Sequence, residues 1–154
     1  MKYALSRETP IGPLTLVEED GALIRVCFGL FEEKAQWMQT PLLHQAFAEL
    51  EEYFRGERKQ FSVPLRPQGT PFQLHCWEAL VRIPYGETRT YAQQAQAIDN
   101  PRACRAVGMA NHRNPLPVFI PCHRVIGSGG TLTGYAGGLS IKETLLRIER
   151  NAAV

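Results

Sequence analysis

Residues 90–112 read TYAQQAQAIDNPRACRAVGMANH, and this segment predicts two helices joined by a short turn. Thr90 suits the N-cap of a first helix over residues 91–98, because its side-chain oxygen can accept a hydrogen bond from a backbone N–H of the first turn. Asp99 and Asn100 then end that helix, and Pro101 can start a second helix over residues 102–112. Helix, tight turn and helix is the pattern of a helix-turn-helix unit.

The second of these helices has a basic side. At about 100° per residue, its charged residues fall on one side and its small or apolar residues fall mostly on the other. The first set comprises Arg102, Arg105, Met109, His112 and Arg113, and the second comprises Ala103, Cys104, Val107 and Gly108. Small side chains at Ala103, Ala106 and Ala110 would let the helix backbone approach another surface closely. A solvated basic face on an ordinary packed helix explains the pattern equally well.

The N-terminal part predicts a sheet and a helix. Residues 14–17 and 23–28 are strand-like and flank Asp20-Gly21, which is a hairpin signal. Apolar residues from Leu43 to Phe54 recur at helical spacing, and residues 61–65 alternate as a short strand would. Two prolines and a glycine within residues 66–71 then mark a boundary. We therefore expect an α+β protein, with a small sheet-and-helix domain over residues 1–68 and a helical domain with a winged-helix-like helix-turn-helix over residues 69–154.

Composition is that of a soluble globular protein, which we expect in the cytoplasm because no signal-like or membrane-spanning apolar run is visible. The four cysteines are scattered without CxxC pairing, so we expect free thiols and no metal site. Residues 1–70 hold 8 Lys/Arg against 10 Asp/Glu, whereas residues 71–154 hold 9 against 5. This basic excess is compatible with DNA binding but does not establish it.

A cysteine and a histidine are adjacent in IPCHRVI, residues 120–126. A thiol is nucleophilic only as its anion, and a neighbouring cationic or proton-accepting group lowers its pKa. Cys122 is therefore either a reactive thiol served by His123 or a buried structural cysteine. Residues 118–120 predict a buried strand that presents Cys122 at its end. Successive strand residues point to opposite faces, so contact between Cys122 and His123 needs a turn or a bridging water.

Two further segments could contribute to a site around Cys122. Glu149 follows a helical apolar stripe of Ile141, Leu145 and Ile148, and it either faces inward to orient His123 or lies in solvent at the helix end. Residues 127–138 are rich in glycine but match neither common phosphate-loop pattern. A loop that closes over a flat ligand, with Tyr135 as one wall, fits this composition better.

Taken together, these motifs resemble the methylated-DNA–protein-cysteine methyltransferases, also called O6-alkylguanine-DNA alkyltransferases. The resemblance covers residues 72–150 in order and at compatible spacing. It is carried by Arg105-Ala106-Val107-Gly108, Asn114-Pro115, Ile120-Pro121-Cys122-His123-Arg124-Val125-Ile126, Gly134-Tyr135-Ala136-Gly137-Gly138 and Lys142-Glu143 through Leu145-Leu146 to Glu149. The chain departs from the family at Gln94, where an apolar residue is usual, and at Cys104, where alanine is usual.

The resemblance implies direct-reversal repair of DNA by a monomer that needs no cofactor, no metal and no membrane. It implies irreversible transfer of the alkyl group from a flipped O6-alkylguanine to Cys122, once per molecule, with O4-alkylthymine as a second candidate substrate. His123 would act as the base through a water, Glu149 would orient His123, Asn114 would hold the hinge, and Tyr91 would assist nucleotide rotation and protonation of the departing guanine. Arg105 would fill the gap in the base stack, from a helix that lies in the minor groove. DNA contacts would come from Ala103, Arg105, Ala106, Gly108, His112 and Ser128, and the base pocket would be lined by Pro117, Val125, Tyr135 and Ala136.

Two other classes of protein share part of this pattern. A non-catalytic lesion-binding or transcriptional helix-turn-helix protein would keep Arg105 and the basic face but would not need Cys122. A Cys-His-Glu hydrolase would keep the thiol but would turn over small esters or amides without DNA. The intact Pro-Cys-His-Arg motif argues against the first class, and turnover of small esters or amides would identify the second.

Overall fold

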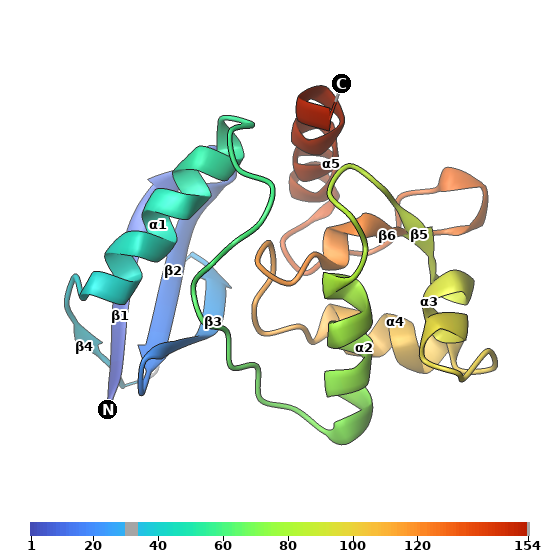
Figure 1. Ribbon diagram of the computed structural model, residues 1–154, viewed down its shortest axis with the longest axis horizontal. Coiled ribbons are helices and arrows are strands. Elements are labelled where there is room, and N and C mark those ends of the chain that lie inside the picture. The colour runs from blue at the N-terminus through green and yellow to red at the C-terminus, as the bar shows by residue number, and fades with distance from the viewer. Residues whose placement is uncertain (30–33, 154) are drawn as a thin grey trace. The chain divides into compact units, whose positions relative to one another are not determined.

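The computed structural model describes residues 1–29 and 34–153, which form two compact units over residues 1–68 and 69–154 (Figure 1). The sheet and helix of the first unit and the helices of the second give the mixed α+β class that the sequence predicts. No helix within the described residues combines the length and the apolar character needed to span a membrane. Within the same residues, no cluster of three or more His, Cys, Asp or Glu side chains could hold a metal ion.

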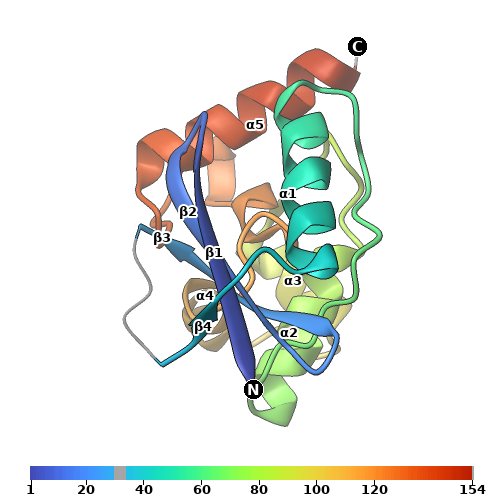
Figure 2. The ribbon, with the colours of Figure 1, turned by 90° about the vertical axis from the view of Figure 1, so that its left-hand side faces the viewer.

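The first unit is built on a four-stranded sheet in the order β3-β2-β1-β4 (Figures 1 and 2). The strands β1 (Lys2–Thr9), β2 (Gly12–Glu19) and β3 (Ala22–Phe28) pair antiparallel, and β4 (Gln36–Trp37) pairs parallel with β1. Asp20 and Gly21 join β2 to β3 with φ of 50° and 80°, as a type I′ hairpin turn requires. The predicted hairpin is therefore confirmed. β1 was not anticipated from the sequence.

The helix α1 (Pro41–Phe54) packs on the sheet through the predicted apolar stripe. Leu43, Phe47 and Leu50 are buried together with Leu14 and Leu16 of β2. The strand predicted over residues 61–65 is wrong: only a single bridge joins Leu23 to Leu65. Pro64 lacks the N–H that would continue a ladder, so the pairing stops after one bridge.

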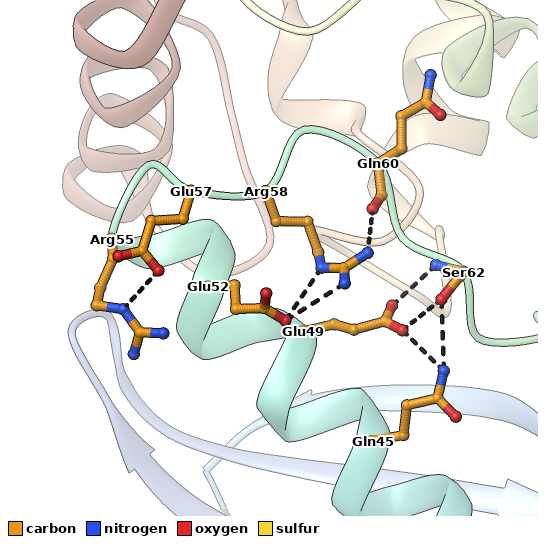
Figure 3. A network of polar contacts seen from close by, with 8 residues as sticks. All are labelled: Gln45, Glu49, Glu52, Arg55, Glu57, Arg58, Gln60 and Ser62. Atoms are coloured by element: carbon orange, nitrogen blue, oxygen red, sulfur yellow. Dashed lines mark hydrogen bonds and ion pairs between the residues drawn. The ribbon is translucent and has the colours of Figure 1, made fainter.

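A polar network fixes the chain that follows α1 (Figure 3). The buried carboxylate of Glu49 accepts hydrogen bonds from the Ser62 backbone N at 2.8 Å, from Ser62 Oγ at 2.5 Å and from Gln45 Nε2 at 2.9 Å. Burial would raise the pKa of Glu49, but these hydrogen bonds outweigh it and hold the pKa below its usual value. Arg58 also donates to Glu52, so hydrogen bonds from Arg58 and Ser62 hold the segment after α1 against that helix.

The second unit holds four helices, two short 3-10 turns and a two-stranded parallel pair within its described residues. The helices are α2 (Pro71–Val81), α3 (Tyr91–Ala97), α4 (Cys104–His112) and α5 (Leu139–Ala153), and the strands are β5 (Arg89–Thr90) and β6 (Val125–Ile126). Thr90 caps α3 as predicted, in a reciprocal capping box with Gln93. Helices α2, α3 and α4 pack against one another, which gives the expected helix-turn-helix arrangement.

The start of the second helix was predicted two residues too early. Pro101 and Arg102 lie in the turn, and α4 begins at Cys104 after Ala103. Asp99 adopts φ of 57°, a left-handed conformation, because the chain must reverse sharply between the two helices. The predicted basic side of α4 is confirmed. Val107 is fully buried, whereas the residues assigned to the basic side are all exposed: Arg102, Arg105, Met109, His112 and Arg113.

The interior of the helix-turn-helix contains a pair of buried amides. Gln94 Nε2 donates to Asn111 Oδ1 at 2.9 Å, and Asn111 Nδ2 donates back to Gln94 Oε1 at 2.7 Å. Gln94 Nε2 also lies 3.2 Å from the Cys76 carbonyl of α2, and Trp77 Nε1 donates to the Ala110 carbonyl at 2.9 Å. Directed hydrogen bonds thus fix the end of α4 to both α2 and α3.

Candidate active site

The backbone that leads to Cys122 is a tight turn, so the strand predicted over residues 118–120 is wrong. The side chain of Asn114 holds both ends of this turn, donating to the Ile120 carbonyl at 2.8 Å and accepting from the Leu116 N–H at 2.9 Å. Val118 has φ of 73° within it. A left-handed β-branched residue is strained, and it persists here because Asn114 and burial of Val118 fix the backbone around it.

Cys122 and His123 lie in a 3-10 turn, Cys122–Arg124, directly after Pro121. Pro121 has φ of −81° and ψ of 65°, and the Cys122 N–H bonds to the Ile120 carbonyl at 2.8 Å, which together make an inverse γ-turn. The turn removes the alternation that a strand would impose on adjacent side chains. Cys122 is 9% exposed and His123 is fully buried, so both are enclosed in the protein.

Glu149, near the C-terminal end of α5, contacts the buried imidazole of His123. Its Oε2 lies 2.5 Å from His123 Nε2, and it is only 1% exposed. The same carboxylate accepts from Arg124 Nε at 2.8 Å and from the Gly86 N–H at 3.2 Å. Of the two positions considered for Glu149, the structure has the inward-facing one.

Arg124 and Lys142 were given no role from the sequence, although both are buried cations in the site. Arg124 donates to Glu149 and to the Ile83 carbonyl at 2.7 Å, and its guanidinium lies 5.6 Å from the ring centroid of Tyr85. Lys142 is 1% exposed and donates to the Val125 carbonyl at 2.6 Å. For Arg124 the signal that could have revealed it is a basic residue within an apolar run, and for Lys142 it is a position three residues before the buried Leu145 on the same helix. Lys and Arg are seldom fully buried unless they are paired.

Burial sets the resting charge of the candidate nucleophile and base. It raises the pKa of Cys122 to about 11, although the nearby Asn114 amide and Lys142 ammonium act in the opposite direction. It likewise lowers the pKa of His123, against the effect of Glu149. Burial would raise the pKa of Glu149, but the hydrogen bonds from His123 and Arg124, the charge that His123 carries once acid protonates it, and the charge of Arg124 bring it to about 2. At neutral pH the site therefore holds a thiol, a neutral imidazole and a carboxylate.

The other residues assigned from the resemblance lie in three places. Asn114, Pro117, Val125 and Tyr135 are buried close in sequence to the Cys122 turn, whereas Ala136 is exposed. On α4, Arg105, Ala106 and His112 are exposed and Gly108 is half-buried, as is Ala103 directly before the helix. Ser128 is exposed in a separate 3-10 turn, Ser128–Gly130, and no contact joins it to α4 among those described.

Tyr91 starts α3 and connects it to the glycine-rich loop. Its hydroxyl lies 2.6 Å from Thr133 Oγ1. Its ring lies against α4, since a Cβ placed on Gly108 would be 3.6 Å from Tyr91 Cε1.

Tyr135 is the second tyrosine assigned to the site. Burial, and then the nearby Cys122, raise the pKa of Tyr135 well above its usual value, so the Tyr135 phenol stays protonated.

The fold and the site define a helix-turn-helix protein that also carries a buried Cys-His-Glu arrangement. Comparison with known protein families agrees with this class. Residues 71–151 match the DNA binding domain of 6-O-methylguanine DNA methyltransferase, and residues 1–67 match the ribonuclease-like domain of the same family. The chain belongs to the family of methylated-DNA–protein-cysteine methyltransferases.

Individual relatives are similar over almost the whole chain. The constitutive methylated-DNA–protein-cysteine methyltransferase of Bacillus subtilis strain 168 is 50% identical over 163 residues, which cover 97% of this chain and 96% of the relative. The crystal structure of Mycobacterium tuberculosis O6-methylguanine methyltransferase superposes with a TM-score of 0.91 at 40% identity, covering 100% of this chain and 96% of that one. A structure of the M. tuberculosis OGT in complex with DNA gives a TM-score of 0.90 at 42% identity, covering 97% and 94%.

Proposed function

We propose that this protein repairs O6-alkylguanine in duplex DNA by moving the alkyl group irreversibly onto Cys122, once per molecule. The observation that carries the proposal is the enclosed Cys122–His123–Glu149 arrangement in the same unit as a basic helix-turn-helix. The thiolate sulfur of Cys122 attacks the alkyl carbon, the bond from that carbon to guanine O6 breaks, and the guanine departs with the electron pair. O4-alkylthymine presents the same kind of carbon and is a second candidate substrate.

Formation of the thiolate requires a base, because burial keeps Cys122 protonated at neutral pH. His123 uses Nε2 to donate to Glu149, which leaves Nδ1 as the proton-accepting nitrogen. The thiol proton then moves to Nδ1 through a water, and the negative Glu149 stabilises the imidazolium that results. A neutral resting imidazole suits this role, since only the unprotonated ring can accept the proton.

The target carbon must leave the base stack before Cys122 can attack it. Flipping costs a few kcal/mol, and less for a poorly paired lesion. Arg105 is exposed on α4 and would fill the gap, while the small Ala103, Ala106 and Gly108 let that helix lie close to the minor groove, with His112 and Ser128 as further contacts. These positions face outward or are half-buried, as a DNA-contacting surface requires.

The remaining assigned residues hold the flipped base and assist its departure. Pro117, Val125, Tyr135 and Ala136 would line the base pocket, and Asn114 would hold the turn that carries Cys122. Tyr91 would rotate the nucleotide and protonate the departing guanine, which makes the guanine a better leaving group. We also propose that the protein is a monomer located in the cytoplasm, where it has access to DNA. Residues 69–154 would form a winged-helix-like domain, and residues 1–68 would have an accessory role.

The deciding experiment is mass spectrometry of the protein after incubation with duplex DNA that contains O6-methylguanine. We expect one added methyl group per molecule, mapped to Cys122, at a stoichiometry near one. Cys122→Ala should bind the lesion duplex and gain no mass. Unchanged mass in the wild type together with tight lesion binding would indicate a binding-only protein, and turnover of small esters would indicate a hydrolase.

A further inference from the structure

Thr133 contacts functional groups from two other elements. Its Oγ1 lies 2.6 Å from the hydroxyl of Tyr91 in α3. Its carbonyl accepts a hydrogen bond from Lys142 Nζ of α5 at 3.2 Å. One residue of the glycine-rich loop thus touches both the phenol that would protonate the departing guanine and the ammonium that would face the thiolate.

The loop around Thr133 is closed at its base, so these contacts do not depend on a loosely placed chain. Lys142 Nζ donates to the Val125 carbonyl at 2.6 Å as well as to Thr133, so one buried cation holds the backbone just before the loop and the backbone at its centre. The Gly127 N–H donates to the Thr131 carbonyl at 2.7 Å. A Cβ on Gly127 would meet Thr133 Cγ2 at 3.1 Å, so the start of the loop and Thr133 are closely packed.

We propose that Thr133 is a positioning residue for alkyl transfer: its hydroxyl fixes the Tyr91 phenol, and its carbonyl, with that of Val125, fixes the buried Lys142 ammonium. This inference rests on the proposed function. A phenol can deliver a proton in a productive direction only if a fixed partner orients it. A nearby ammonium favours a thiolate, and the Lys142 ammonium lowers the pKa of Cys122 while Cys122 raises that of Lys142.

A purely structural explanation is that Thr133 closes a surface loop and has no part in the chemistry. The two explanations differ in what the hydroxyl is for. Thr133→Val removes the hydroxyl and keeps the branched shape, whereas Thr133→Ser keeps the hydroxyl and removes a methyl group. If packing alone matters, the serine variant should be affected at least as much as the valine variant.

The test is single-turnover methyl transfer from saturating O6-methylguanine duplex, measured for Thr133→Val, Thr133→Ser, Tyr91→Phe and the double variant Tyr91→Phe/Thr133→Val. We expect Thr133→Val to slow transfer about five- to tenfold, the effect of losing one oriented hydrogen bond. Thr133→Ser should stay within about twofold of the wild type. In the Tyr91→Phe background, Thr133→Val should add little, because the partner hydroxyl is already gone.

Three controls make the result specific. Thr131→Val removes an exposed hydroxyl of the same loop and should leave the rate unchanged. The dissociation constant for the duplex and the midpoint of thermal unfolding show whether a slow variant still binds and folds. Equal rates for the valine and serine variants, or independent effects of Thr133→Val and Tyr91→Phe, would overturn the inference. Failure of the wild type to gain a methyl group would instead overturn the proposed function.

Discussion

At the scale of single residues, burial determines how the thiol can be activated. Many cysteine nucleophiles rest as thiolates because they are partly exposed beside a cation. Here burial keeps the Cys122 proton in place, and the charge in the site resides on Glu149, Arg124 and Lys142. The His123–Glu149 contact could be anticipated only as one of two possibilities, because the two residues are 26 positions apart in the sequence. Arg124, which shares the same carboxylate, was not anticipated.

Glu149 should make stability depend on pH in acid. Its pKa is about 2 in the folded protein against 4.5 as the ordinary value, so its contribution is fully present above pH 4.5 and is lost as pH falls toward 2. We expect the free energy of unfolding of the wild type to fall by about 3 kcal/mol more than that of Glu149→Gln over this range. Urea unfolding at several pH values measures this, with Glu143→Gln, an exposed change on the same helix, as the control. Parallel curves for the wild type and Glu149→Gln would contradict it.

At the scale of elements, Gln94 has a structural role that the helical pattern of α3 does not reveal: it links α3 to α4. The resemblance leads us to expect an apolar residue at this position, and helical periodicity gives no reason for a glutamine on a buried face. The structure pairs it with Asn111 of α4, and each amide satisfies the other. The predicted Thr90 cap of α3 and the basic side of α4 were confirmed, because they depend on near neighbours in the chain. The true start of α4 at Cys104 depends on the sharp reversal at Asp99, which propensity does not indicate.

The amide pair predicts non-additive mutations. Gln94→Ala leaves the buried Asn111 amide without its partner, so it should lower the free energy of unfolding by about 2 kcal/mol. Gln94→Leu combined with Asn111→Leu removes both polar groups and should cost less than the sum of the two single changes. Urea denaturation of the wild type, Gln94→Leu, Asn111→Leu, the double variant and Gln94→Ala provides the comparison, and Gln96→Ala on the exposed side of α3 is the matched control. Strict additivity would show that the two amides do not depend on each other.

At the scale of the whole molecule, positive charge is modest and unevenly divided. Residues 71–154 hold 9 Lys/Arg against 5 Asp/Glu, and of these Arg124 and Lys142 are buried in the site. Arg102, Arg105 and Arg113 remain exposed on or beside α4. We therefore expect DNA binding by this surface to rely on few phosphate contacts, with shape and base flipping supplying selectivity.

A weak salt dependence should follow from this charge distribution. The logarithm of the affinity for undamaged duplex should fall against the logarithm of salt concentration with a slope no steeper than about −4. Arg102→Gln should reduce the steepness by about one, without a change in sequence preference. Fluorescence anisotropy with a labelled duplex measures both slopes. A slope near twice that value would mean that a larger basic surface binds DNA.

The sequence by itself determined the α+β class, the Asp-Gly hairpin, the amphipathic stripe of α1, the capped helix-turn-helix and the basic side of α4. These features depend on residues within a few positions of one another, where spacing, capping and turn preferences act directly. Only the tertiary structure decided that the backbone before Cys122 turns, that Glu149 faces His123, and that Thr133 meets Tyr91 across 42 residues. Such contacts arise when packed elements bring distant side chains together, and no local pattern in the chain specifies them.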